Sequence, residues 1–492
     1  MTPPTQDRSP IKHEPFLHTV AKYASSRLYR QVLGVVTAYL RPKLLSPEQY
    51  GLWTLLGVIP GYAAYLHLGA QHSMRFLIPY YKSLDDTTRV TTMKETVFSA
   101  SLCLTGLASI VLLLAALLPN LSMDVRLGLA TMAIFIILQC IQEYYISLLK
   151  ADERFPLLAR SFYVQTTVSF VFTVVLLLLF KLHGLYLSIL LTFTVIVFFL
   201  RANYSAGIRL SFRYSVFREL VVRGFPIMVA DLAVELLSTS DRLVISGLLG
   251  RREMGYYGIA TIVFGFLLQI PGTTREIMEP RMMRQVAHHG EDEITAEYLL
   301  KPIVNTAYLL PFLIGPVFFG LPVLIPLVLP RYSPAIVPTQ ILVFGIYFMA
   351  LSYAPRMFIV ARNWQKASAM LLPVVLLANV SLSVTLVKTG FGLAGVAFSS
   401  GVSFFLLFLT LFGLVMVRIK PTGSHWRRHL AGIAIPFPTM ILAILLLARF
   451  VPAVVPNPYL GCGVSIIVFW GTMLGLHAIA RRQLPLLRGI EI

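Results

Sequence analysis

The chain has 492 residues, of which 57% are hydrophobic and 13% charged, and its mean hydropathy is +0.76. Soluble domains carry about 25% charged residues, so this composition excludes a soluble globular protein and indicates a polytopic membrane protein. The three cysteines, Cys103, Cys140 and Cys462, all lie in apolar runs. Neither a disulfide framework nor a metal site is therefore indicated.

The opening segment MTPPTQDRSPIKHEPF is polar and lacks the apolar core of a signal peptide. We therefore expect a cytoplasmic tail over residues 1–18. A membrane helix needs about 20 mostly apolar residues, and this rule predicts an all-α protein with about 14 spans. The predicted spans are 21–42, 50–76, 95–118, 126–149, 157–180, 184–203, 220–248, 253–281, 302–329, 333–358, 367–387, 393–417, 429–449 and 459–480.

The basic residues support this topology. With a cytoplasmic N-terminus, 31 of the 41 lysines and arginines fall on the cytoplasmic side, nine fall outside, and Arg242 lies within the seventh span. This asymmetry follows the positive-inside rule and predicts that both termini are cytoplasmic. The net charge of +19 is then explained by topology and by attraction to anionic membrane lipids. It needs no nucleic-acid partner.

A short hairpin occurs twice. LSPEQYGLW at 45–53 returns as LGRREMGYY at 249–257, and an offset of 204 places Gly51 on Gly255. Because the copies are six spans apart, they have the same orientation. This predicts two six-helix lobes related by a parallel pseudo-two-fold axis, a known transporter architecture. The expected parts are the N-lobe 19–204, a cytoplasmic linker 205–219, the C-lobe 220–418, and helices 13 and 14 with the C-terminal tail at 419–492.

The residues also carry a resemblance to a family. The segments LSPEQYGLWTLLGVIPGYAAYLHLGAQHSMRFLIPYY, STSDRLVISGLLGRREMGYYGIA and FGLAGVAFSS resemble the polysaccharide transporter (Wzx-type flippase) branch of the multidrug/oligosaccharidyl-lipid/polysaccharide exporter superfamily. One departure is visible, because His67 stands where that branch commonly has an acidic residue before the glycine. We transfer no role to this position.

The resemblance implies transport, not catalysis. The implied substrate is an undecaprenyl-pyrophosphate-linked oligosaccharide, such as an O-antigen or exopolysaccharide repeat unit, moved from the inner to the outer leaflet of the bacterial inner membrane by alternating access. Polysaccharide polymerase and chain-length machinery are the expected partners. No cofactor is expected. Since the sequence contains no P-loop, an H+ or Na+ gradient, or the pull of polymerisation, remains as the energy source.

Ionisable residues inside membrane segments mark pathways, gates and ion sites. The predicted gate or ion-coupling residues are Asp231, Glu235, Glu143, Asp241 and Arg242. Under the 204 offset, Arg27 coincides with Asp231. We therefore expect these two residues to approach across the lobe interface and close the cytoplasmic side. The alternatives are that Arg27 snorkels to the headgroups, that Asp231 and Glu235 pair with a neighbouring arginine, and that Asp241–Arg242 is a structural motif.

A pyrophosphate is matched by arginines, which bind it as bidentate donors. The predicted substrate-binding residues lie near cytoplasmic helix ends and are Arg27, Arg30, Arg75, Arg275 and Arg356. Ordinary positive-inside placement explains these positions equally well. Three other functions remain open: a multidrug or cation antiporter of the same superfamily, a lipid II flippase, and a membrane glycan polymerase. The short predicted outer loops disfavour the polymerase.

Overall fold

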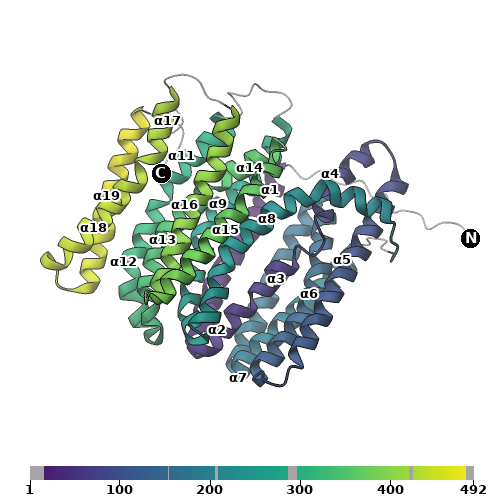
Figure 1. Cartoon of the computed structure of the whole chain (residues 1–492), viewed down its shortest axis with the longest axis horizontal. Coiled ribbons are helices and arrows are strands. Elements are labelled where there is room, and N and C mark those ends of the chain that lie inside the picture. Colours follow the sequence, from purple (N-terminus) through teal and green to yellow (C-terminus); the bar gives the residue numbers. More distant parts are fainter. Residues whose placement is uncertain (1–15, 153, 205–208, 286–295, 420–424, 484–492) are drawn as a thin grey trace, which may run out of the picture. The chain divides into compact units, whose positions relative to one another are not determined.

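The computed structural model describes residues 16–152, 154–204, 209–285, 296–419 and 425–483. Within these ranges the chain forms helices and no strand (Figure 1), which confirms the predicted all-α class. Ten of the described helices are long and apolar enough to cross a membrane.

The longer helices are α1 (Phe16–Leu44), α4 (Ala70–Ser83), α5 (Thr87–Ala116), α6 (Met123–Ala151), α7 (Phe155–Asn203), α8 (Tyr214–Leu248), α9 (Arg251–Gln285), α12 (Pro311–Val328), α13 (Ile336–Leu351), α15 (Gln365–Lys388), α16 (Gly392–Ile419), α18 (Pro436–Val454) and α19 (Pro458–Gln483). The shorter ones are α2 (Pro47–Leu56), α3 (Val58–Ala63), η1 (Ala296–Leu300), α11 (Lys301–Leu309), η2 (Pro330–Ala335), α14 (Tyr353–Ala361) and α17 (His425–Ala434).

The chain forms two compact units. The first unit contains the described residues up to Leu44 and those of Leu66–Val221, and the second contains Leu45–Tyr65 and the described residues from Val222 onward. The hairpin helices α2 and α3, which were predicted to be part of the N-lobe, thus belong to the second unit. The predicted lobe boundaries themselves stay a prediction.

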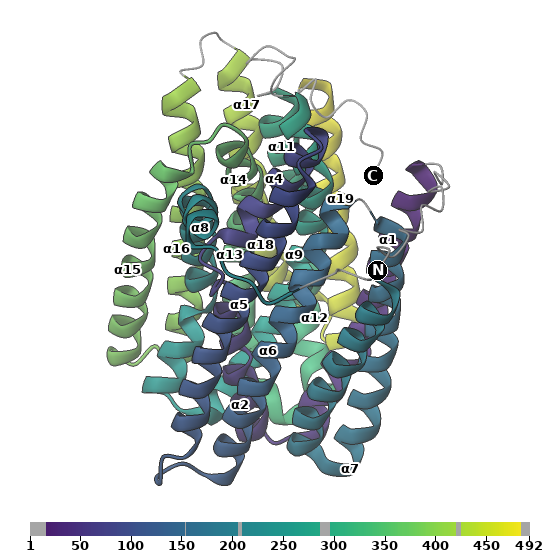
Figure 2. The same cartoon turned by 90° about the vertical axis from the view of Figure 1, so that its right-hand side faces the viewer.

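In the first unit, α6 packs between α5 and α7, and α1 packs along α7 (Figure 2). A buried apolar cluster near one end of these helices includes Met74 of α4, Met93 of α5 and Leu148 of α6. Tyr144 lies in the same cluster, and its hydroxyl donates to the carbonyl of Lys94 at 2.8 Å. The cluster also takes in residues of α7 and of the start of α8, so apolar burial holds five helices together at this end.

The second predicted span, 50–76, is not one continuous helix. It is divided into α2, α3 and α4, with left-handed backbone at Leu68 (φ 50°) and Gly69 (φ 86°). Left-handed residues cannot continue a right-handed helix, so α4 begins anew after Gly69. The turn is held by the Gly69 N–H, which donates to Nδ1 of His67 at 2.9 Å.

The fifth and sixth predicted spans form the two halves of α7. The backbone is non-helical at Lys181 (φ 50°, ψ −122°), which separates the halves. Gly184 follows this turn. A Cβ atom at Gly184 would lie 1.9 Å from the carbonyl oxygen of Leu176, so only glycine permits the tight return.

In the second unit, the strongly buried helix α13 packs against α16 and α9, and α15 packs against α16. The C-terminal helices α18 and α19 pack against each other and against α12 at the edge of this unit (Figure 1). Four prolines lie in α12 at 311, 316, 322 and 326. Neighbouring helices satisfy the backbone groups that such prolines release.

Candidate functional site

An ion pair lies inside the second unit. Oδ1 of Asp231 on α8 accepts hydrogen bonds from Nε of Arg356 on α14, at 3.1 Å, and from Nη2 of the same guanidinium. The two side chains are only 16% and 14% exposed. Burial of two charges is costly unless they are paired and hydrogen-bonded, which this geometry provides. The structure therefore joins a predicted gate residue to a predicted substrate-binding residue.

Glu235 lies one helical turn after Asp231 on the same face of α8. Its carboxylate has no hydrogen bond or ion pair with the residues that the structure describes. It lies against α3, where a Cβ atom at Gly61 would be 2.9 Å from Oε1. Glycine at position 61 thus leaves room for the carboxylate. The charges that act on Glu235 are those of Arg242 and Arg356.

Tyr353 joins these groups into one cluster. It lies three residues before Arg356 on α14 and is close enough to Arg275, Arg356 and Glu235 to interact electrostatically with each. The guanidinium carbon of Arg275 lies 6.0 Å from the centroid of the Tyr353 ring. We call Asp231, Glu235, Arg275, Tyr353 and Arg356 the charged cluster of the second unit.

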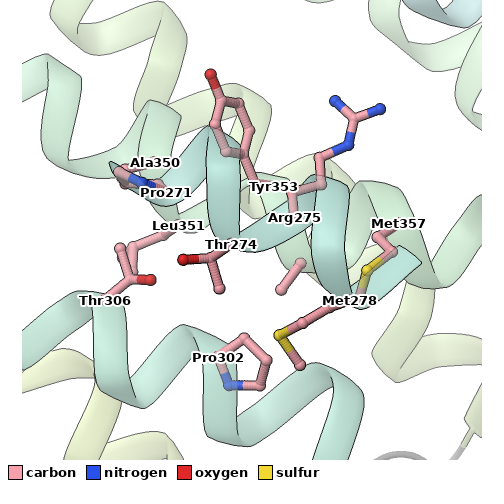
Figure 3. A pocket seen from close by; sticks show the side chains of 11 residues that line it. Pro271, Thr274, Arg275, Met278, Pro302, Thr306, Ala350, Leu351, Tyr353 and Met357 are labelled. Carbon is pink, nitrogen blue, oxygen red and sulfur yellow. The ribbon is translucent and has the colours of Figure 1, made fainter. Parts of the chain in front are cut away.

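A pocket opens beside this cluster (Figure 3). Its walls are mainly apolar, and Thr274 and Thr306 add hydroxyl groups. Figure 3 shows the guanidinium of Arg275 and the phenol of Tyr353 extending to one side, away from Met278 and Pro302. The site thus combines a cationic group with an adjoining apolar surface.

Asp241 and Arg242 lie further along α8, and Asp241 is 4% exposed. Its Oδ2 accepts the Tyr257 hydroxyl at 2.6 Å, and its Oδ1 accepts the Arg242 backbone N–H at 2.7 Å. The adjacent Ser240 hydroxyl contacts Oδ1 of the fully buried Asn379 at 3.3 Å. These contacts join α8 to α9 and α15, and the role of the Asp241–Arg242 pair stays a prediction.

The other predicted residues belong to the first unit. Arg30 of α1 holds its guanidinium 4.4 Å above the Phe162 ring, and Glu143 of α6 accepts from Gln139 at 3.1 Å. Arg27 and Arg75 lie on α1 and α4, but their side chains are outside the described part of the structure. The predicted approach of Arg27 to Asp231 therefore stays a prediction.

Sequence reasoning missed a second ionic site, at the ends of four helices of the first unit. Asp152 follows α6, and its carboxylate lies 2.5 Å from Nζ of Lys82 and 3.7 Å from Nζ of Lys94. It also accepts the hydroxyl of Tyr204, which follows α7. Burial alone would raise the pKa of Asp152, but Lys82, Tyr204 and Lys94 hold that pKa below its ordinary value.

The sequence contains signals for only some of the residues in the charged cluster and the Asp152 site. Tyr353 precedes Arg356 by three residues, so helical spacing alone places both on one face. Gly61 carries no such signal, because its role depends on the carboxylate of Glu235, 174 residues later. The partners of Asp152 likewise come from three other helices.

Comparison with known proteins identifies the family of this chain. Residues 42–330, more than half of the chain, match the family described as polysaccharide biosynthesis protein. The chain therefore belongs to this family, which confirms the resemblance found in the sequence. None of the curated proteins matches it.

Solved structures share the fold. The lipid II flippase MurJ in an inward closed conformation has a TM-score of 0.69 at 14% identity, covering 95% of this chain and 99% of its own. An inward-facing MATE-family multidrug resistance transporter of the MOP superfamily has a TM-score of 0.62 at 13% identity, covering 82% and 98%. This chain thus has the fold of MOP-superfamily transporters and flippases.

Proposed function

We propose that this protein is a flippase that moves an undecaprenyl-pyrophosphate-linked oligosaccharide from the inner to the outer leaflet of the bacterial inner membrane. In this proposal, about 14 spans form two lobes with both termini in the cytoplasm, and the substrate passes between them by alternating access. The sugar is an O-antigen or exopolysaccharide repeat unit. Family membership supports the polysaccharide pathway, and the MurJ-like fold supports a lipid-linked substrate.

The observation that carries the proposal is the Asp231–Arg356 pair within the charged cluster. Sugars and a pyrophosphate cannot cross hydrocarbon unassisted, because burial of unpaired charge costs many kcal/mol. The guanidinium of Arg356 is held inside the fold. Asp231 binds it through Nε and Nη2, and arginine uses the same kind of paired N–H donors to bind a phosphate. A pyrophosphate that competes with Asp231 for Arg356 exchanges one anion for another, and no buried cation is left unpaired.

Arg275 supplies a second cation beside Tyr353, next to the apolar pocket of Figure 3. The proposed mode of binding places the pyrophosphate between the two arginines and the first isoprene units of the lipid along the apolar wall. The remaining lipid stays in the bilayer. The arginines are matched to the diphosphate, and the apolar wall is matched to the hydrocarbon chain.

We assign the coupling step to Glu235. A carboxylate in a membrane segment without a partner among the described residues is suited to exchange a proton or Na+. The Glu235 carboxylate lies on the same face of α8 as Asp231. Loss or gain of a cation at Glu235 therefore changes the electrostatic potential at the Asp231–Arg356 pair. This links an ion gradient to release of the pyrophosphate.

The test is a flipping assay on the purified full-length protein in proteoliposomes. Lipid-linked oligosaccharides extracted from the host membranes are incorporated, and membrane-impermeant periodate oxidises only the sugars that face outward. Mass spectrometry then counts the oxidised fraction. A flippase exposes nearly the whole pool with time, whereas the pool in protein-free vesicles stays about half oxidised. An unchanged half fraction with active protein contradicts the proposal.

The fold match to MurJ favours one second candidate, a lipid II flippase. The same vesicles distinguish it, because lipid II and the extracted repeat-unit lipid are incorporated together and are separated by mass. Selective exposure of lipid II would show that lipid II, and not the repeat-unit lipid, is the substrate.

A further inference from the structure

The start of α8 is fastened to the first unit. The Ser73 hydroxyl on α4 donates to the carbonyl of Leu220 at 2.7 Å, and Arg89 at the start of α5 forms an ion pair with Glu219 at 2.8 Å. Leu220 is only 1% exposed and belongs to the buried apolar cluster of this unit. The first two turns of α8 are therefore held against the first unit.

The residues just before α8 run along α5. Residues 209–213 are not helical. The backbone N–H of Ser211 donates to the Ser99 hydroxyl at 3.0 Å, and the backbone N–H of Arg213 donates to the Thr96 hydroxyl at 3.4 Å. N–H groups two residues apart that bond to the same neighbour indicate an extended chain, in which successive side chains point to opposite sides.

This extended segment has an amphipathic pattern. Leu210, Phe212 and Tyr214 are each more than half exposed. They alternate with Arg209 and Arg213, which are also exposed. With a period of two residues, the apolar side chains lie on one side of the segment and the arginines lie on the other.

The position along α5 gives the depth of the segment in the bilayer. α5 has 30 residues and is about 45 Å long, whereas the hydrocarbon core is about 30 Å thick. The length that crosses this core, about 20 residues, reaches back from Ala116 to Thr96. Charged side chains, which are kept out of the core, occur before this point at Arg89, Lys94 and Glu95. The extended segment thus lies where α5 enters the hydrocarbon.

The same face of α5 continues as an apolar stripe. Residues that follow Ser99 at three- and four-residue spacing share its face, and they are exposed at Cys103, Leu107, Ile110 and Leu114. A continuous exposed apolar stripe on a helix long enough to span the membrane marks a surface that faces lipid. The extended segment therefore lies at the base of a lipid-facing surface.

The positive charge of the segment is not neutralised by the protein. Arg209, Arg213 and Arg218 form no ion pair with the residues that the structure describes. The only acidic residue in the sequence 209–221 is Glu219, and Arg89 pairs with it. Exposed arginines at the membrane boundary match the phosphates of anionic headgroups.

We propose that residues 209–218 form an interfacial segment that binds anionic phospholipids of the cytoplasmic leaflet. Leu210, Phe212 and Tyr214 insert beside the acyl chains, and the three arginines bind the headgroup phosphates. Zwitterionic lipids bind less tightly, because each of their phosphates is accompanied by a cationic amine. The inference does not depend on the transported substrate, so it is independent of the proposed function.

The test places a fluorescent reporter in the segment. Phe212→Trp is made in the full-length protein and reconstituted in nanodiscs of phosphatidylglycerol and phosphatidylcholine, in which one lipid or the other carries bromine on its acyl chains. Bromine quenches nearby tryptophan, and the signal of the four native tryptophans is subtracted with the parent protein. The two quenching curves give the relative binding constant of the lipids. Phosphatidylglycerol should be favoured about fivefold for each arginine that binds a headgroup.

Variants of the reporter protein separate charge from folding. Replacement of the three arginines with glutamine should lower the preference for phosphatidylglycerol to near one, whereas replacement with lysine should keep most of it, because lysine retains the charge. The matched control removes the same charge from exposed positions of the second unit, by Arg331→Gln, Lys388→Gln and Arg449→Gln, and should keep the full preference. Monodispersity and thermal unfolding of each variant show that it folds.

Each outcome bears on one part of the proposal. An added tryptophan that neither brominated lipid quenches would overturn the interfacial location, and equal quenching by the two lipids would overturn the anionic preference. Displacement of brominated phosphatidylglycerol by trace amounts of undecaprenyl pyrophosphate would show that the arginines bind that lipid instead. Loss of flipping with an intact lipid preference would count against the proposed function alone.

Discussion

Gly51 and Gly255 contact each other's helix reciprocally across the seam between α2 and α9. A Cβ atom at Gly51 would lie 1.9 Å from the carbonyl oxygen of Arg251, and one at Gly255 would lie 1.9 Å from that of Pro47. Both the glycines and the carbonyls are 204 residues apart, which is the offset of the sequence repeat. Reciprocal contacts of equivalent residues are the mark of a two-fold relation.

The first prediction concerns this seam. Gly51→Ala and Gly255→Ala should each destabilise the protein, by about 1–3 kcal/mol, because no rotamer can relieve a Cβ that overlaps a backbone carbonyl. Thermal unfolding of the purified variants measures the loss. Gly265→Ala is the control, since Gly265 is also in α9 but has no atom within 4 Å of a Cβ. Equal stability of all three variants would contradict the packing described.

The second prediction concerns Asp231 and Arg356. Either Asp231→Asn or Arg356→Gln breaks this buried ion pair, and breaking such a pair costs about 3–5 kcal/mol. The double variant removes both charges and should regain most of that stability. Thermal unfolding of the three variants forms a double-mutant cycle. Additive losses in the cycle would show that the two residues do not interact.

The same variants separate folding from transport. If Arg356 binds the pyrophosphate, the double variant should be stable and inactive in the flipping assay. A double variant that transports at the wild-type rate would remove Arg356 from the substrate site.

The third prediction is a pH dependence of stability. The folded-state pKa of Asp152 is lowered, so the unfolded chain takes up its proton first as the pH falls. Stability from Asp152 is therefore complete at neutral pH and is lost as the pH falls from the unfolded pKa, about 3.9, through the lower folded pKa.

Thermal unfolding as a function of pH tests this directly. Asp152→Asn should lose stability at neutral pH and show a weaker decline in acid than the wild-type protein. The exposed Asp85 provides the control, because Asp85→Asn keeps a residue type that tolerates its positive φ of 55°. A decline in acid that is the same for Asp152→Asn and wild type would reject the role of Asp152.

The fourth prediction concerns Glu235. Glu235→Gln keeps the volume of the side chain but removes its charge, so the protein should fold while its transport no longer responds to an imposed proton or Na+ gradient. Gly61→Ala should impair transport more than stability, because the carboxylate end of Glu235 is flexible and can move away from the new Cβ. A gradient response that survives in Glu235→Gln would exclude this residue from coupling.

Much of the fold follows from apolar runs and local signals. The all-α class was predictable because about 20 apolar residues can only be a helix in a membrane. The count of about 14 spans stays a prediction, since ten of the described helices are long and apolar enough to cross. The repeat was visible in two short hairpins, which contain Gly51 and Gly255 at equivalent positions. The break at Leu68–Gly69 was not predicted, since the apolar run continues through it.

Most residues of the charged cluster were predicted from the sequence, but the sequence did not show which of them would pair. Asp231 and Glu235 were singled out because carboxylates inside a predicted membrane span are expensive. The choice of Arg356 as a partner, 125 residues away, depends on how α8 packs near α14. Asp152 was overlooked for a related reason: a carboxylate in a basic loop is unremarkable in sequence, and only the fold brings Lys82, Lys94 and Tyr204 to it.

The most direct test of the central claim is the undecaprenyl-linked lipid pool of cells depleted of this protein. The lipids are extracted and identified by mass spectrometry, with a plasmid-borne wild-type copy as the control. The account predicts that one oligosaccharide diphosphate lipid accumulates on the cytoplasmic side and disappears when the wild-type copy is restored. An unchanged pool, with altered sensitivity to cationic drugs, would contradict the flippase and indicate an antiporter.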